Sequence, residues 1–189
     1  LTKAYNDGNF KVAYEGLKKL ALDPKNDPKL VGKDLELAIN ALMRLGRTDE
    51  VDAFRESVIQ VHPTNWRLLQ TAAHTLIQGE HIGFMIAGEF KRGGHRGGGH
   101  LMNSLQRDRV RALQLMEQAH NNLRDENDRG AIASFYLDFA NLLATAAGHS
   151  DAWRLQYLTD LTKLPDYDEG YWWHRNRNHN GAPVDDKGD

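Results

Sequence analysis

The sequence contains no cysteine, so disulfide bonds, thiolate metal ligands and thiol nucleophiles are excluded. It also lacks any apolar run that approaches the roughly 20 residues of a membrane-spanning helix. Neither sign of charge is in large excess, because 24 Lys and Arg residues stand against 26 Asp and Glu residues. A uniformly basic surface is therefore not expected, and neither is non-specific binding of nucleic acid.

The length of 189 residues, with 40% hydrophobic residues, suits one domain with a buried core. The chain begins at Leu1 without a signal peptide, and residues 181–189 suggest that the natural chain continues. We therefore expect a fragment of a longer protein, whose compartment the composition alone does not indicate.

Helical periodicity dominates the sequence. Apolar residues recur every three or four positions, which builds one apolar stripe along a helix. Several of these stretches end at a proline or glycine that stops a helix, such as Pro24, Gly46 or Pro63. The pattern predicts helices over 10–22, 35–45, 48–62, 65–78, 107–123, 128–147 and 151–164.

The glycine-rich stretch 79–106 interrupts this pattern. A stable helix is excluded there, because each interior glycine costs about 1 kcal/mol relative to alanine. The portion from Ile82 to Phe90 is too apolar for a free linker. We expect it to pack on the helices, with a partly extended conformation left open.

The same arrangement, a glycine before a helix and a proline at its end, occurs twice. Gly8 precedes a helix that ends at Pro24, and Gly46 precedes one that ends at Pro63. Gly79 follows Gly46 by about 33 residues, close to the 34-residue tetratricopeptide period. The residues of the two units are Ala4, Tyr5, Gly8, Asn9, Phe10, Ala13, Leu20 and Pro24, then Leu35, Ala38, Ile39, Leu42, Gly46, Val51, Val58 and Pro63.

Through these residues the chain resembles tetratricopeptide repeats over 1–79, and more loosely over 107–164. The resemblance implies helix pairs that bury their apolar faces by stacking on neighbouring pairs. We therefore predict an all-α fold, a right-handed superhelix of antiparallel helix pairs over 1–164, with 79–106 inserted in the third pair. Residues 165–189 are predicted to be an irregular tail or a linker to a following domain.

Other segments are similar to the helical N-terminal region of large bacterial alpha-2-macroglobulin-like proteins. That family is exported and resembles protease-trapping inhibitors, so the resemblance implies a periplasmic or exported location. Without it we expect a cytoplasmic one. The family's thioester motif needs a cysteine, which implies that this chain is a flanking interaction region. The segments are Phe90–Gly93, Arg96–Gly99, Arg107–Leu115, Ala152–Leu161 and Gly181–Asp185.

Repeat positions predict a peptide-binding groove on the inner face of the stack. Basic and amide side chains there could hold an acidic or carboxylate-ended peptide by charge-assisted hydrogen bonds. The alternative is a solvated polar face. The predicted groove residues are Lys33, Asn40, Arg44, Arg67, Gln70 and His74.

The loop 91–100 places arginines among glycines. We consider contact of Arg92 and Arg96 with another domain of the parent chain, contact with RNA, or a structured loop whose arginines dock on acidic groups. Trp172 and Trp173 in the tail either fold back on the last helix or contact a partner domain. A phosphate-binding P-loop is not supported, because no Gly-Lys-Ser/Thr follows.

The segment that starts the helix after this loop alternates arginine with acid. Asp108 in the first turn suits the helix dipole. We expect Arg107, Arg109 and Arg111 to tie the glycine-rich loop to the body of the protein by salt bridges.

The histidines do not form a metal-binding motif. His95 and His100 lie five positions apart in the loop, and His174 and His179 repeat that spacing in the tail. We predict no metal, cofactor or catalytic residue, and a non-catalytic protein-interaction or scaffolding module whose partner is a protein, a peptide or another domain. The alternatives are a metal-dependent hydrolase that uses the loop histidines, and a nucleic-acid-binding module that uses the Arg/Gly-rich loop.

Overall fold

The computed structural model describes residues 1–124, 126–145 and 161–170. Over these residues the chain forms seven α-helices, one 3-10 turn and a four-stranded antiparallel sheet. The elements are α1 (Thr2–Asn6), α2 (Phe10–Ala21), α3 (Val31–Arg44), η1 (Thr48–Glu50), α4 (Val51–Val61), α5 (Trp66–Ile77), β1 (Ile82–Ile86), β2 (Glu89–Arg92), β3 (His100–Asn103), α6 (Leu105–Asn121), α7 (Arg129–Thr145) and β4 (Asp168–Glu169).

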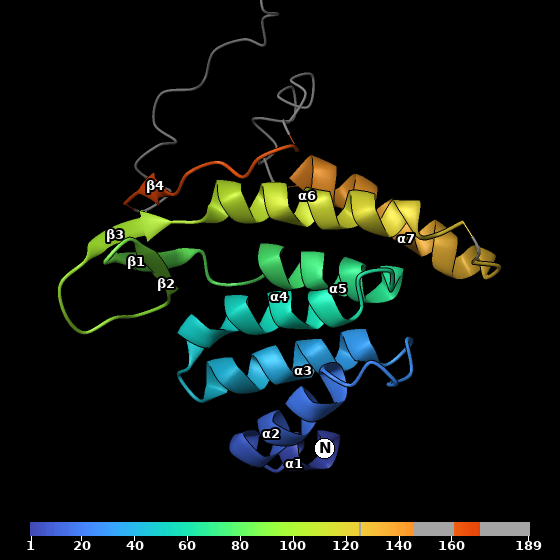
Figure 1. The fold of residues 1–189 in the computed structure, drawn as a ribbon, viewed down its shortest axis with the longest axis horizontal. Helices are drawn as coiled ribbons and strands as arrows, with labels where there is room; N and C mark the ends of the chain where they lie inside the picture. Colours follow the sequence, from blue (N-terminus) through green and yellow to red (C-terminus); the bar gives the residue numbers. More distant parts are fainter. Residues whose placement is uncertain (125, 146–160, 171–189) are drawn as a thin grey trace, which may run out of the picture.

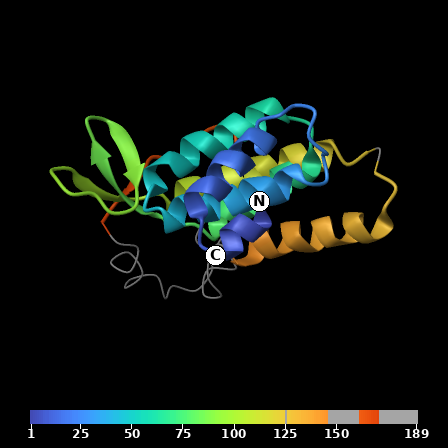
Figure 2. The ribbon, with the colours of Figure 1, turned by 90° about the horizontal axis from the view of Figure 1, so that it is seen from below.

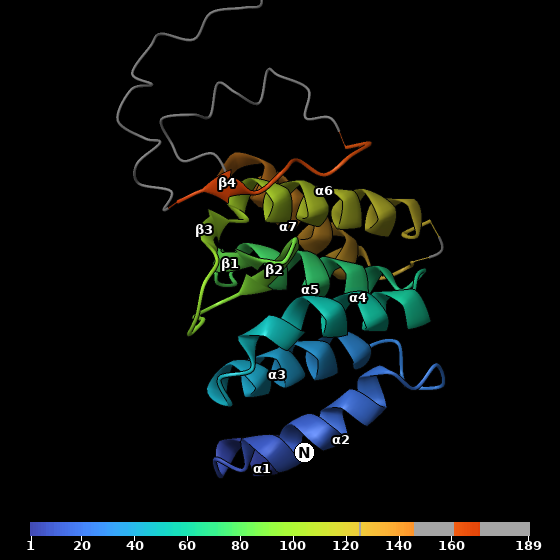
Figure 3. The same ribbon diagram turned by 60° about the vertical axis from the view of Figure 1, so that its left-hand side comes forward.

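The helices form successive layers, from α1 and α2 at one end of the molecule to α6 and α7 at the other (Figures 1 and 3). Neighbouring layers pack through α2 with α3, α3 with α5, and α5 with α6. One hydrophobic core runs through the layers. Its largest fully buried side chains are Tyr14, Leu17, Val31, Leu35, Leu42, Val58, Leu68, Leu69, Leu115, Met116 and Phe135.

The helices over 10–22, 35–45, 48–62, 65–78, 107–123 and 128–147 are confirmed within a few residues over their described parts. Local signals explain their ends. Gly46 follows Leu45, the C-cap of α3, and adopts a φ of 70°, a conformation that glycine tolerates best. Asn65 caps α5, since its side-chain oxygen accepts a hydrogen bond from the backbone N–H of Leu68. Most of the helix predicted over 151–164 lies outside the described residues.

A glycine brings α3 and α5 together. A Cβ atom added at Gly32, in the first turn of α3, would lie 2.7 Å from Oγ1 of Thr71 on α5. The missing side chain therefore permits the close approach of the two helices at this point. Among the described residues, no helix is both long enough and apolar enough to span a membrane.

The sheet shows that the prediction of an all-α fold is wrong. Its strands run in the order β2-β1-β3-β4, and every neighbouring pair is antiparallel. The glycine-rich insertion folds into the first three strands, which lie beyond one end of the helices (Figure 2). Ala87 and Gly88 connect β1 to β2, both with positive φ angles of 50° and 84°. Positive φ at both central positions is the geometry of a two-residue hairpin turn.

Gly83 of β1 creates space on one face of the sheet. A Cβ atom there would lie 2.6 Å from Cζ of Phe90, whose ring passes over this position from β2. The Phe90 ring stacks on that of Tyr167, with 4.4 Å between centroids. Tyr167 precedes β4, so part of the segment assigned to the tail is joined to the insertion. Arg107 of α6 also holds this segment, donating to the backbone carbonyl of Pro165 at 2.8 Å.

Candidate functional site

A buried ion pair joins the sheet to the helices. Arg92, the last residue of β2, is 6% exposed, and Asp108, in the first turn of α6, is 4% exposed. The guanidinium of Arg92 donates from Nη1 and Nη2 to Oδ2 and Oδ1 of Asp108, at 2.8 and 2.9 Å. Ser104 donates to Oδ2 at 2.6 Å, and Nδ1 of His81 lies 2.8 Å from the same oxygen. The carboxylate therefore has partners on both oxygens.

These contacts determine the protonation state of the pair. Burial by itself raises the pKa of a carboxyl group, but the hydrogen bonds from His81, Arg92 and Ser104 outweigh it and hold the pKa of Asp108 below its usual value. The pKa of Arg92 lies above its usual range despite burial, because Asp108 and Asp52 stabilise the charged form. Both groups are therefore charged at neutral pH.

The network continues to α4 through Asp52. Nε of Arg92 donates to Oδ2 of Asp52 at 2.9 Å, and Nη1 of Arg55 donates to Oδ1 of Asp52 at 2.7 Å. Arg55 is itself 2% exposed, and its Nε donates to Oγ1 of Thr75 on α5 at 2.9 Å. Asp52 thus bridges two buried arginines, one from the sheet and one from the helices.

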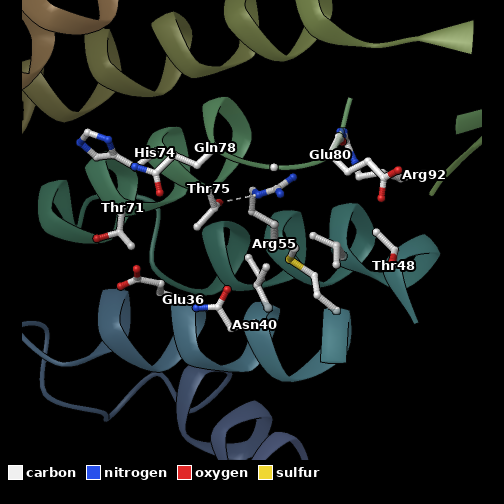
Figure 4. A pocket seen from close by; sticks show the side chains of 14 residues that line it. Glu36, Asn40, Thr48, Arg55, Thr71, His74, Thr75, Gln78, Glu80 and Arg92 are labelled. Atoms are coloured by element: carbon white, nitrogen blue, oxygen red, sulfur yellow. Dashed lines mark hydrogen bonds between the residues drawn. The ribbon is translucent and has the colours of Figure 1, made fainter. Parts of the chain in front are cut away.

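A cavity of about 280 Å³ opens beside Arg55, among α3, α4 and α5 (Figure 4). Its apolar lining comes from Ile39, Met43 and Val51. Figure 4 shows Asn40 on α3 and Arg55 between α3 and α5, joined to Thr75 by a hydrogen bond. The polar lining residues are Glu36, Asn40, Thr48, Arg55, Thr71, His74, Thr75, Gln78, Glu80 and Arg92.

The structure divides the predicted groove residues into two groups. Asn40 and His74 line the cavity. Lys33 and Arg44 are exposed on α3 and are not among the lining residues. The cavity therefore brings together part of the predicted set and adds residues of α4 that the repeat positions did not indicate.

The predicted groove residues on α5 contact acidic side chains of this same chain. Nη2 of Arg67 donates to Oε2 of Glu126 at 2.8 Å. Nε2 of Gln70 donates to Oδ2 of Asp138 on α7 at 2.5 Å, and Nε2 of His74 lies 3.3 Å from that oxygen. Basic and amide groups of α5 thus already bind carboxylates, although these come from the following helical layer.

Among the other predicted contact residues that the structure describes, Arg92 lines the cavity and Arg96 does not. Arg92 lies in the buried network described above, which is the docking of a loop arginine on acidic groups. Arg96 is exposed between β2 and β3. Trp172 and Trp173 lie outside the described residues.

Arg107 and Arg111 of α6 were expected to tie the glycine-rich loop to the body of the protein, but they bind other elements. Arg111 forms an ion pair with Glu56 of α4 at 2.7 Å, and Arg107 binds the Pro165 carbonyl. Within the described part of the chain, the side chains of Arg107 and Arg111 form no ion pair or hydrogen bond with the glycine-rich insertion 79–106. The tie between insertion and body instead joins Arg92 of the insertion to the acid of this helix, Asp108.

Histidine, serine and acid come together without the order of a catalytic triad. The His81 ring and Ser104 both contact Oδ2 of Asp108, and Ser104 also contacts the backbone carbonyl of His81, whereas a nucleophilic serine would donate to the imidazole ring. Ser104 is fully buried, so a substrate has no access to its hydroxyl. His95, in the loop between β2 and β3, and His100, the first residue of β3, are both exposed. In the described part of the chain, no group of three or more His, Asp or Glu residues could hold a metal ion.

Arg55 is the site residue that the sequence analysis missed. It follows Phe54 and lies on the same helical stripe as Val51 and Val58, all of them buried. A charged residue on an apolar stripe is a signal that can be recognised without coordinates, because buried charges are paired or functional.

Comparison of the chain with protein-family models, with curated proteins and with solved structures gives no match. The resemblances to tetratricopeptide repeats and to alpha-2-macroglobulin-like proteins therefore stay predictions.

Proposed function

We propose that this chain is a non-catalytic protein-interaction module that binds a peptide segment of a partner protein in the cavity among α3, α4 and α5. The observation that carries the proposal is the cavity itself, which combines an apolar floor with hydrogen-bonding side chains from three helices. Such a mixture is typical of sites that bury one or two side chains of a ligand and orient its polar groups.

The surroundings of the cavity support a preformed site. α3 and α5 are in direct contact at Gly32 and Thr71, and Arg55 joins α4 to α5 through Thr75. A site on packed helices needs little rearrangement to accept a ligand, which lowers the entropic cost of binding. The chemistry of the lining favours binding over catalysis, since its hydroxyl groups are threonines and Thr71 and Thr75 donate to backbone carbonyls of their own helix.

Selection from a displayed library of random linear peptides tests this proposal. We expect binders whose affinity falls at least about tenfold in Asn40→Trp, because the larger side chain fills the cavity. Gln60→Trp is the matched control, since Gln60 is exposed on α4 and does not line the cavity. Circular dichroism establishes that both variants are folded. A selection without binders, or binders that a folded Asn40→Trp variant retains at full affinity, would overturn the proposal.

A further inference from the structure

Arg55 is a buried cation with an unused hydrogen-bonding group. Its Nε and Nη1 donate to Thr75 and Asp52, as described above. Within the described residues, Nη2 has no hydrogen-bond acceptor, and it keeps some contact with solvent although the side chain as a whole is 2% exposed. Arg55 lines the cavity, and Figure 4 shows its side chain among the other lining residues, with a hydrogen bond to Thr75.

The charge of Arg55 is only partly compensated. Its one carboxylate partner, Asp52, also accepts two hydrogen bonds from Nε of Arg92, at 2.9 and 3.1 Å. Burial lowers the pKa of the Arg55 guanidinium even though Asp52 opposes that effect. Most of this charge is shielded from water while Nη2 stays open to a ligand, and a charge-assisted hydrogen bond from a group in such surroundings is stronger than a neutral one, so an anionic acceptor would be bound favourably.

The neighbouring side chains restrict the kind of anion. The amides of Asn40 and Gln78 line the same cavity and offer neutral donors. Glu36 and Glu80, which are exposed, also line it and repel negative charge. A group with one negative charge, spread over two oxygens, fits this lining better than a phosphate with about two charges.

We infer that Arg55 is the anchor for a carboxylate group of the bound peptide, with Nη2 donating to one carboxylate oxygen inside the cavity. This inference rests on the proposed function and specifies its ligand class. The carboxylate belongs either to the C-terminus of the peptide or to an Asp or Glu side chain, because both present the same two oxygens. Arg55 lies on α4, apart from the residues on α3 and α5 that were expected to bind acidic peptides.

Binders from the peptide library provide the test. Each is resynthesised in three forms: with a free C-terminus, with an amidated C-terminus, and with its Asp and Glu residues changed to Asn and Gln. We expect one of the two neutralised forms to lose about 10- to 100-fold in affinity, as for loss of a hydrogen bond to a charged group. The form that loses affinity identifies the source of the carboxylate.

Arg55→Gln supplies the second measurement. Asp52 keeps its partner Arg92 in this variant, which favours folding. We expect the variant to bind the intact peptide about as weakly as the wild type binds the neutralised one, and to make no distinction between the two. Lys33→Gln, which removes an exposed charge from α3, is the control and is expected to leave the distinction intact.

The outcomes separate the two proposals. Peptides that bind the cavity, as judged by Asn40→Trp, but bind equally well when neutralised would overturn the carboxylate anchor and leave the proposed function standing. Failure to select any peptide would overturn both. If Arg55→Gln does not fold, the comparison of the three peptide forms on the wild-type protein still decides the question.

Discussion

The guanidinium of Arg92 and the carboxylate of Asp108 form a bidentate ion pair in the interior of the protein, in which two nitrogens donate to two oxygens. The two residues belong to different parts of the fold, since one ends a strand of the insertion and the other begins a helix of the stack. The pair therefore holds the sheet in a defined position against the helices, close to Arg55 and the cavity.

Removing one member of this pair leaves the other charge buried without its partner. We expect Asp108→Asn to reduce the free energy of unfolding by about 3–5 kcal/mol, measured by urea denaturation at neutral pH. Glu117→Gln makes the same chemical change on an exposed position of α6, and we expect it to stay within about 0.5 kcal/mol of wild type. Equal effects of the two substitutions would contradict the importance of the ion pair.

The same carboxylate makes stability depend on pH. Because the pKa of Asp108 is lowered in the folded protein, its contribution is present above the unfolded pKa of about 3.9 and is lost as the pH falls through the folded value. We therefore expect the difference in stability between wild type and Asp108→Asn to narrow as the pH falls below about 4. Urea denaturation of both proteins at several pH values measures this difference in the free energy of unfolding. A difference that stays constant down to pH 3 is inconsistent with this assignment.

Gly83 is expected to tolerate no side chain. A methyl group at this position would collide with the Phe90 ring and with the carbonyl of Lys91 on the neighbouring strand. We expect Gly83→Ala to destabilise the protein by about 1–3 kcal/mol, as overpacking does. Gly94→Ala is the control, because no atom lies within 4 Å of a Cβ added there. Thermal denaturation of both variants distinguishes a local collision from a general effect of adding a methyl group.

The contact between Gly32 and Thr71 is expected to show coupling. In the wild-type background, the collision with Oγ1 of Thr71 should outweigh the gain in helix propensity, so that Gly32→Ala destabilises by about 1 kcal/mol. In a Thr71→Ala background, the collision is removed and the same substitution should become neutral or stabilising. A double-mutant cycle from urea denaturation measures the coupling energy. Additive effects would show that the helices separate freely at this point.

How far the fold could be predicted depended on the length of each pattern. The helix of α3 carries Leu35, Ala38, Ile39 and Leu42 at helical spacing, and such a repeat over several turns has few alternative interpretations. The strand β1 has five residues, with a glycine among them, and Asp168–Glu169 form a strand only by pairing with β3. Short strands are stabilised by partners distant in sequence, and no local pattern reports those partners.

The candidate site was only partly predictable for a similar reason. Asn40 and His74 were expected from their positions in the helices, and both line the cavity. Arg55 is marked in the sequence only by a charge on an apolar stripe, and which acid would compensate that charge was not visible. Asp52, three positions away, does so in part, and it shares its carboxylate with Arg92 from another layer of the fold.

The amino-acid sequence by itself determined the succession of helices, their ends, and the absence of cysteine chemistry, because periodicity, capping residues and composition act over short distances along the chain. Only the tertiary structure decided that the glycine-rich insertion is a sheet, that Arg92 meets Asp108, and that Arg55 faces a cavity with one donor unused. These features depend on which segments contact each other in the folded protein. The free energy of burying a charge or pairing a strand is set by those contacts, and the local sequence does not specify them.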